Sequence, residues 1–435
     1  MSAVHAVTLS TAHSVRRVAP PLLSTALISV AGGLLATLLP LRFLAFGYTP
    51  SLVGLFAAAE AVGFIAGCLQ AHRLIAPVGQ VRAYAAFAAL KAGAILGLFF
   101  ADGMAALLIL RALVGFNAAG LTVIVESWLN ALVPNAQRGR VLTIYVLDIG
   151  LFYGVGQLLG HNLDVRGPGM LILAGMTTAL ALVPIAAMVV TGPPPPRPVK
   201  LEILKALRDS PASVLACLLS GLIGTAFLTV GPLFGAQIGL AQPKIIVLMA
   251  CVSLGGLFLQ WPIGYLSDKM DRLKTIIGLG LMLLLVSAAL MTTSQASGIA
   301  TLAILFAAFG GLAESLYPVG VAHANDRAVA ADYVALSSTL LLVWALGSAI
   351  GPVAGALAMD LATPHAFFTY ALGLTLAFTL FATWRLTHRR RDRVAETPEE
   401  FLTYPQTSPE IYAWLPYSGE PGRPAPKSEP HERHD

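Results

Sequence analysis

The chain has 435 residues and a formal net charge of +5, and 57% of its residues are hydrophobic while only 11% are charged. Its mean hydropathy is +0.77. A water-soluble domain normally carries about 25% charged residues, so this composition excludes a large soluble core and indicates that lipid surrounds most of the chain.

The first predicted element follows a basic pair, Arg16 and Arg17, which precedes an apolar run over 18–41. A secretory signal has a shorter apolar segment that ends in small residues at a cleavage site. We therefore expect residues 1–17 to form an N-terminal tail and the run 18–41 to remain as a membrane span.

Eleven further apolar stretches follow, each near the length of about 20 residues that a membrane helix needs. A linker over 192–211, stiffened by the prolines 193–196, divides the spans into six and six. A charged tail over 388–435, expected to be disordered, follows the last span. The predicted spans are 18–41, 51–71, 83–101, 104–131, 141–161, 169–191, 212–235, 244–264, 275–294, 299–322, 333–358 and 365–387.

Lysine and arginine are distributed unevenly between the two sides of these spans. One side would hold only Arg42, Arg166 and Lys244, and the other would hold the remaining basic residues near the spans. Cytoplasmic loops of membrane proteins carry an excess of Lys and Arg. Both termini and the linker are therefore expected in the cytoplasm, in a bacterial inner membrane, and the positive net charge does not indicate nucleic-acid binding.

The two sets of six spans share short matches in a consistent order, which indicates an internal repeat. The repeat predicts an all-α membrane protein whose twelve helices form two pseudo-symmetric six-helix bundles, over 18–191 and 212–387. The matches are Pro40 with Pro232, Gly47 with Gly239 and Gly63 with Gly255 at an offset of 192, Glu126-Ser127 with Glu314-Ser315 at 188, and Gly156 and Gly160 with Gly351 and Gly355 at 195.

The loop after the eighth span, Gly264 to Lys274, resembles the signature of the major facilitator superfamily, with a glycine, an aspartate and a basic cluster. The resemblance implies the major facilitator fold, a transport function, and a loop that latches the two bundles together in one state. The latch residues it implies are Gly264, Asp268, Arg272 and Lys274.

In the first half the corresponding loop departs from this pattern, with His72, Ala76 and Gln80 where the second half has Gly264, Asp268 and Arg272. The second copy must therefore carry any latch. Two glutamates near this face also need partners, since an ionisable side chain in hydrocarbon costs at least about 2.5–3.5 kcal/mol. We expect Glu314 to pair with Arg272 or Lys274, and Glu126 to pair with Arg73 or Arg82.

A narrower resemblance, to the YcaD-like branch of the superfamily, rests on several short segments. Its members mostly lack a known substrate, and riboflavin transporters are related to them, so the resemblance makes riboflavin a candidate solute. The segments are Val125-Glu126-Ser127, Arg138-Gly139-Arg140, Gly156-Gln157-Leu158-Leu159, Gln260-Trp261-Pro262-Ile263-Gly264 and Leu316-Tyr317-Pro318-Val319.

Three charged residues fall at a similar depth in neighbouring spans, namely Glu60, Lys91 and Arg111. At 1.5 Å per helical residue, each lies about 10–15 Å below the outer surface. One interpretation is a structural ion pair between Glu60 and Lys91. The other is a site in which Arg111 attracts a polar or anionic solute while Glu60 exchanges its partner for a proton.

Asp148 lies seven residues into the fifth span and has no cation within one turn of its own helix. A lone carboxylate there suits a proton carrier or a ligand for a cationic group. Alternatively, Asp148 pairs with Arg138 or Arg140. The sequence leaves both interpretations open.

Seven uncharged residues within the spans combine amide or aromatic groups that could hydrogen-bond to a flat ring or stack on it. Each could equally serve helix packing or anchoring at the membrane surface. These residues are Asn117, Tyr145, Gln157, Gln260, Trp261, Tyr317 and Trp344.

The three cysteines, Cys68, Cys217 and Cys251, lie in apolar segments and predict neither a disulfide nor a metal site. No enzyme motif is found, so we expect no catalytic residue and no cofactor. The expected partners are a small-molecule solute, the bilayer and, as a hypothesis, protons, with the protein a monomer. A proton-coupled exporter, a membrane-embedded enzyme and a channel remain as alternatives, and Val155 stands where the antiporter motif has proline.

Overall fold

The computed structural model describes residues 2–133, 138–188, 201–328 and 333–388, and all regular structure within them is helical. The predicted proline run 193–196 and all but the first residue of the predicted tail 388–435 lie outside the described residues. The helices are α1 (Ser2–Ala45), α2 (Pro50–Val78), α3 (Gln80–Gly97), α4 (Met104–Leu132), α5 (Arg138–Leu159), η2 (Gly160–Asn162), α6 (Gly169–Leu180), α7 (Leu182–Ala186), α8 (Ile203–Asp209), α9 (Pro211–Leu219), η3 (Ser220–Thr225), α10 (Ala226–Gln237), α11 (Gln242–Lys269), α12 (Arg272–Met291), α13 (Ile299–Asn325), α14 (Tyr333–Leu361) and α15 (Ala366–Thr387).

Eleven helical segments in the described part of the chain are long and apolar enough to cross a membrane. The remaining predicted span corresponds to α3, an 18-residue helix that packs against α4 and α6. Gln80, Arg82 and Lys91 lower its hydropathy without interrupting the helix. The prediction of twelve membrane helices is therefore confirmed.

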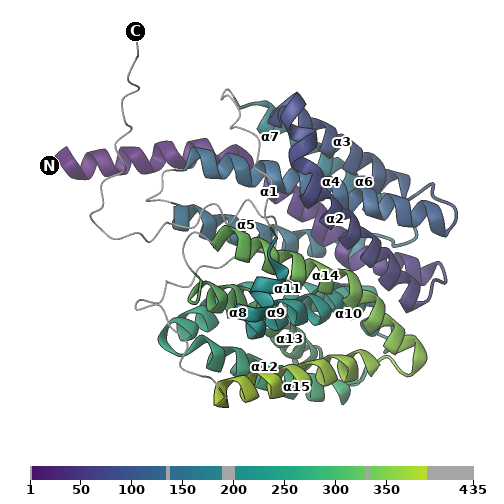
Figure 1. Cartoon of the computed structure of the whole chain (residues 1–435). Helices are drawn as coiled ribbons and strands as arrows, with labels where there is room; N and C mark the ends of the chain where they lie inside the picture. Colours follow the sequence, from purple (N-terminus) through teal and green to yellow (C-terminus); the bar gives the residue numbers. More distant parts are fainter. Residues whose placement is uncertain (1, 134–137, 189–200, 329–332, 389–435) are drawn as a thin grey trace, which may run out of the picture.

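The helices form two halves that pack in the same way (Figure 1). In the N-terminal half, drawn purple to blue, α2 packs on α4, α1 on α5 and α3 on α6. In the C-terminal half, drawn teal to yellow, α11 packs on α13, the rod of α9, η3 and α10 packs on α14, and α12 packs on α15. Each helix pair of the N-terminal half corresponds, by the repeat, to one pair of the C-terminal half. The pseudo-symmetry seen in the sequence therefore extends to the packing.

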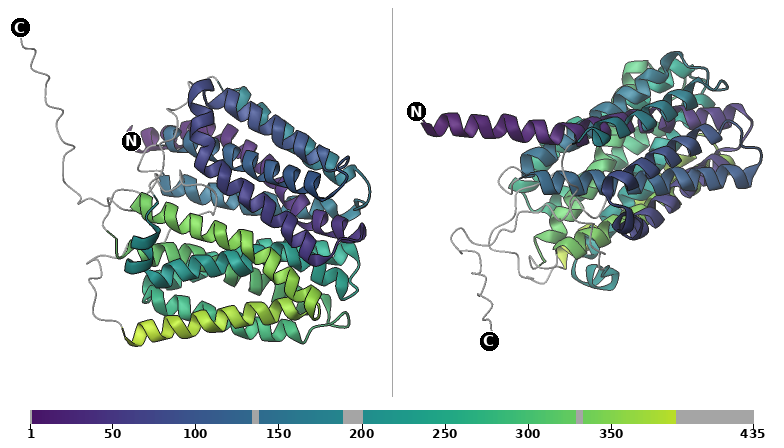
Figure 2. Two further views of the ribbon diagram at one scale, coloured as in Figure 1. Left: turned by 45° about the vertical axis from the view of Figure 1, so that its right-hand side comes forward. Right: turned by 90° about the horizontal axis from the view of Figure 1, so that it is seen from above.

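Two elements differ from the sequence prediction. Helix α1 already begins at Ser2, so the backbone of residues 2–17, predicted as a separate tail, continues the first span beyond the bundle (Figure 2). The seventh span is not a uniform α-helix, because residues Ser220–Thr225 form a π-helical turn. Such turns are rare and occur frequently at functional sites.

The two halves meet closely at the end of the molecule that carries the short turns 46–49, 160–168, 238–241 and 362–365, here termed the loop end. The amide of Ser51 on α2 donates a hydrogen bond to the Asp360 carboxylate on α14 at 2.8 Å. Across the other side of the seam, the Gln242 side-chain amide donates to the carbonyl oxygen of Leu163 at 2.7 Å. These bonds hold the halves together at the loop end.

Candidate functional site

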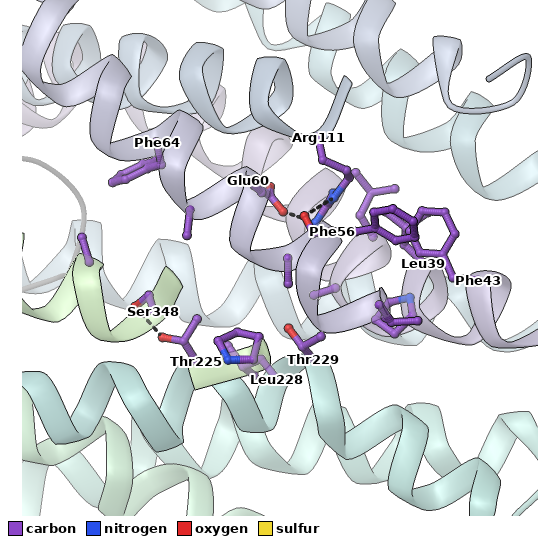
Figure 3. A pocket seen from close by; sticks show the side chains of 18 of the residues that line it. Leu39, Phe43, Phe56, Glu60, Phe64, Arg111, Thr225, Leu228, Thr229 and Ser348 are labelled. Atoms are coloured by element: carbon purple, nitrogen blue, oxygen red, sulfur yellow. Dashed lines mark hydrogen bonds and ion pairs between the residues drawn. The ribbon is translucent and has the colours of Figure 1, made fainter. Parts of the chain in front are cut away.

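A cavity of about 370 Å³ lies between the two halves (Figure 3). This volume falls within the usual range of sites for small organic ligands. Its walls come from α1, α2, α4 and α5 on one side and from η3, α10 and α14 on the other. The lining residues are Leu35, Ala36, Leu39, Pro40, Phe43, Val53, Phe56, Ala57, Glu60, Ala61, Phe64, Arg111, Tyr153, Thr225, Leu228, Thr229, Trp344, Ala345, Ser348 and Pro352.

The N-terminal wall of the cavity carries an ion pair between Glu60 and Arg111 (Figure 3). Glu60 lies ten residues beyond Pro50, the first residue of α2, which places it about 15 Å along the helix from the loop end. Arg111 also donates from Nε to the carbonyl oxygen of Phe56 at 3.4 Å. Two apolar helices thus hold opposite charges against each other, which lowers the cost of burying either one.

Lys91 was predicted to join this pair or to be the partner of Glu60. It is buried on α3 and interacts electrostatically with both Glu60 and Arg111, so the three charges do lie near one another. However, the Glu60 carboxylate pairs with Arg111, and Lys91 does not line the cavity. The predicted Glu60–Lys91 ion pair is therefore wrong, because Arg111 on the adjacent α4 faces Glu60 directly.

The C-terminal wall supplies hydroxyl groups and an indole ring. Thr225, the last residue of the π-helical turn, shares a 2.9 Å hydrogen bond with Ser348 on α14. Trp344 lies one turn before Ser348 and lines the same cavity, and its ring forms a T-shaped pair with the buried ring of Tyr317 at 6.1 Å between centroids. Tyr317 itself lies behind this wall, outside the cavity lining.

Other comparisons agree with this architecture. Residues 22–297 and 214–427 match the sequence model of the Major Facilitator Superfamily, and together these matches include nearly every helix of both halves. The chain belongs to the major facilitator superfamily. As expected for this family, it is a multi-pass membrane protein.

Curated relatives of this chain include members of the YcaD-like branch, to which the sequence resemblance pointed. Proteins of Salmonella arizonae and Salmonella typhi, both described as "Uncharacterized MFS-type transporter YcaD", are 28% identical over 360 residues, which cover 81% of this chain and 92% of each relative. Those names state transport without a substrate.

Solved major facilitator structures share the fold. The bacterial homolog of the human lysosomal transporter Spinster, in an inward-facing and occupied conformation, gives a TM-score of 0.70 at 15% identity and covers 87% of this chain and 98% of its own. The D-xylose-proton symporter gives 0.66 at 15% identity, over 88% and 99% of the two chains. At such low identity the likeness concerns the fold and not the solute.

The signature loop of this major facilitator chain is held by ion pairs within the C-terminal half. Arg272 pairs with Asp268 at 3.4 Å and with Asp326, at the end of α13, at 3.0 Å. The predicted partner Glu314 lies twelve residues before Asp326 on the same helix, about 18 Å away. The Glu314 prediction is therefore wrong.

The other predicted latch residues lie at the same face. Gly264 is buried on α11, in agreement with close helix packing. Among the residues that the structure describes, Lys274 has no ion pair, so it is not the partner of Glu314 either. The ion pairs of Arg272 with Asp268 and Asp326 join α11, α12 and the end of α13.

Glu126 was predicted to pair with Arg73 or Arg82, but both arginine side chains are exposed whereas Glu126 is fully buried. Instead, Glu126 accepts a 3.0 Å hydrogen bond from the hydroxyl of Tyr145 on α5. The prediction failed because depth within a span fixes height but not the side of the helix. Tyr145 therefore supports a buried carboxylate and does not line the cavity.

Asp148 also does not line the cavity. Within the described residues it has no ion pair or hydrogen bond, and one of its carboxylate oxygens is buried. The predicted partner Arg140 is exposed and makes no ion pair with it. The side chain of Arg138 lies outside the described residues.

Four further candidates lie outside the cavity. Gln157 on α5 accepts a 2.9 Å hydrogen bond from Ser253 on α11 and so joins the two halves. Asn117 is buried and donates to the Leu113 carbonyl of its own helix at 2.7 Å. Gln260 is partly buried, and Trp261 is 79% exposed.

Several cavity residues carry no charge and were not predicted, notably Tyr153, Thr225, Thr229 and Ser348. The internal repeat contains the signal that could have found two of them. The offset of 195 that relates Gly156 to Gly351 also relates Tyr153 to Ser348. Equivalent positions of the two halves thus face the cavity together.

Proposed function

We propose that this chain is a secondary active transporter in which the cavity between the halves binds a small organic solute. The observation that carries the proposal is the Glu60–Arg111 ion pair, placed in an otherwise mostly apolar cavity lined by both halves. Buried charges in a membrane protein usually mark a solute or ion path. The halves then rock about this site so that it opens to each side in turn.

The direction in which the cavity faces follows from the basic residues. If the positive-inside rule sets the orientation, both termini are cytoplasmic and the loop end faces the outside of a bacterial inner membrane. The Ser51–Asp360 and Gln242–Leu163 hydrogen bonds then close the outer side. Solute entry from outside requires that these bonds break.

The wall favours a solute with a flat or ring-shaped body. Five aromatic side chains line the cavity, and such rings stack on flat solutes. Riboflavin is one candidate for the first tests. The aromatic lining residues are Phe43, Phe56, Phe64, Tyr153 and Trp344.

Proton coupling is a further part of the proposal. Glu60 lies in the cavity and can exchange its arginine partner for a proton, and Asp148 offers a second carboxylate outside it. If neither Glu60→Gln nor Asp148→Asn alters accumulation driven by a pH gradient in proteoliposomes, protons are not coupled through these residues. A loss in Glu60→Gln alone would assign the coupling to the cavity.

The transport proposal is tested in two steps. A thermal-shift screen of the purified protein against vitamins, organic acids and drugs identifies ligands, because a ligand that binds the folded state raises the melting temperature. Saturable uptake or efflux of a hit is then measured in proteoliposomes, with Trp344→Ala as the cavity variant and Trp261→Ala as its matched control. Conversion of the solute without movement, or currents far above about 10³ charges per second, would instead indicate an enzyme or a channel.

A further inference from the structure

The ion pair in the cavity presents its two charges unequally. The side chain of Glu60 is 37% exposed, whereas that of Arg111 is 10% exposed. Two donor groups of Arg111 are already engaged, one by the Glu60 carboxylate and one by the Phe56 carbonyl. A solute in the cavity therefore meets a carboxylate before it meets a guanidinium.

A second carboxylate approaches the seam from the other half. Glu314 is partly exposed on α13, and its side chain lies beside Gly224 of the π-helical turn and Gly256 of α11. Tyr153, which lines the cavity, interacts electrostatically with both Glu60 and Glu314. The acidic groups of both halves, together with Arg111, are thus close enough to this tyrosine to interact with it.

The remaining lining groups suit a positive charge on an apolar body. Aromatic faces attract cations, most strongly where water is excluded. The hydroxyls of Thr225, Thr229 and Ser348 can accept hydrogen bonds from an ammonium group. The buried cation Lys91 does not line the cavity, so it does not compete for contact with the solute.

We propose that the solute of this transporter is an amphipathic organic cation whose charged group binds the carboxylate of Glu60 and whose ring body packs on the aromatic wall. The inference rests on the proposed function, since it specifies the charge of the solute that the cavity takes. A neutral ring such as riboflavin gains only the aromatic contacts. An anion of the same size meets the exposed carboxylate of Glu60, which repels it.

The test uses three fluorescent probes that share one tricyclic ring and differ in charge: N-methylacridinium, N-methylacridone and acridine-9-carboxylate. Binding to the full-length protein in lipid nanodiscs is measured by ligand fluorescence, with riboflavin as a further neutral ring. We expect the dissociation constant of the cation to be about tenfold lower than that of N-methylacridone, because a close charge pair shielded from water adds at least about 1.4 kcal/mol. Equal or tighter binding of the neutral or anionic ring would overturn the proposal.

The double variant Glu60→Gln/Arg111→Gln removes both charges together and so avoids leaving an unpaired buried arginine. It should bind N-methylacridone within about twofold of the parent protein and lose the preference for the cation. The matched control Glu202→Gln changes an exposed glutamate in the linker and should keep that preference. A double variant that still prefers the cation tenfold would contradict the assignment of Glu60.

Measuring the transport of the same probes distinguishes failure of this inference from failure of the proposed function. Saturable movement of acridine-9-carboxylate, with no preference for the cation, would support a transporter and overturn the inference. Tight, Glu60-dependent binding of N-methylacridinium without movement in proteoliposomes would support the inference and contradict the transport proposal.

Discussion

Equivalent positions in the two halves of this protein are used in different ways. Glu126 and Glu314 are related by the offset of 188. Glu126 is buried in the N-terminal half and accepts a hydrogen bond from the Tyr145 hydroxyl, whereas Glu314 is partly exposed beside two glycines. The offset of 192 places Phe64 in the first half where Gly256 stands in the second. A Cβ at Gly256 would meet only the Glu314 side chain, at 4.0 Å, so this position leaves space beside Glu314.

The loops at the same face differ in a parallel way. Arg272 bridges two aspartates in the C-terminal half, while Gln80, which the offset of 192 makes its counterpart, donates a 3.0 Å hydrogen bond to Ser127. A repeated fold thus preserves helix packing but not polar chemistry. The first half provides a buried polar network, and the second half an ionic loop and an accessible carboxylate.

The largest expected effect comes from the ionic loop. Arg272→Leu leaves Asp268 and Asp326 without their shared cation and should lower the free energy of unfolding by about 3–5 kcal/mol. Gln80→Leu, the matched change in the first half, removes the neutral hydrogen bond to Ser127 and should cost about 1–2 kcal/mol. Unfolding in SDS titrations measures both, and equal losses would contradict the difference between the loops.

Two glycines of the C-terminal half compare a closely packed helix contact with the open position beside Glu314. A Cβ on Gly221 would collide with the Trp344 carbonyl of α14, whereas a Cβ on Gly256 would meet only the Glu314 side chain, at 4.0 Å. Gly221→Ala should therefore destabilise the protein by about 1–3 kcal/mol, and Gly256→Ala by less than about 0.5 kcal/mol. If Gly256→Ala costs as much as Gly221→Ala in thermal unfolding, the space beside Glu314 is not open.

Two tyrosines of α5 have different expected roles: Tyr145 hydrogen-bonds to a buried carboxylate, and Tyr153 lines the cavity. Tyr145→Phe removes the hydrogen bond to Glu126 and should cost about 1–2 kcal/mol of stability. Tyr153→Phe removes a cavity hydroxyl and should leave stability within about 0.5 kcal/mol while changing solute affinity. Unfolding and ligand titrations on both variants check this, and the reverse pattern would assign solute contact to Tyr145 instead of Tyr153.

The smallest effect is expected at the loop end. Asp360→Asn weakens an exposed bond to the Ser51 amide and should change stability by less than about 0.5 kcal/mol. Its consequence should appear in the access of the cavity, as faster labelling of a cysteine introduced at Thr229 by an impermeant thiol reagent added from the outside. Unchanged labelling would indicate that this bond does not hold the outer side closed.

The sequence predicted the twelve helices, the two halves and the cavity residues Glu60, Arg111 and Trp344. The length and hydropathy of each span, and the depth of a residue within it, can be read directly from the sequence. It did not predict which side of a helix a residue occupies. Glu126 meets Tyr145 and not the predicted Arg73 or Arg82, and Trp261 does not line the cavity, since a rotation of one helix by a few tens of degrees is invisible in hydropathy. The π-helical turn at Ser220–Thr225 had no sequence signal that could be recognised, and it determines where Thr225 points.

The most direct test of alternating access is a reversible link across the loop end. In a background with Cys68, Cys217 and Cys251 replaced by serine or alanine, Ser51→Cys and Asp360→Cys are joined by a disulfide or a short bis-maleimide, and solute movement in proteoliposomes is compared before and after linking. We predict that the linked protein still binds solute but no longer transports it, and that reduction of the disulfide restores transport. Transport at the parent rate by fully linked protein would contradict the account.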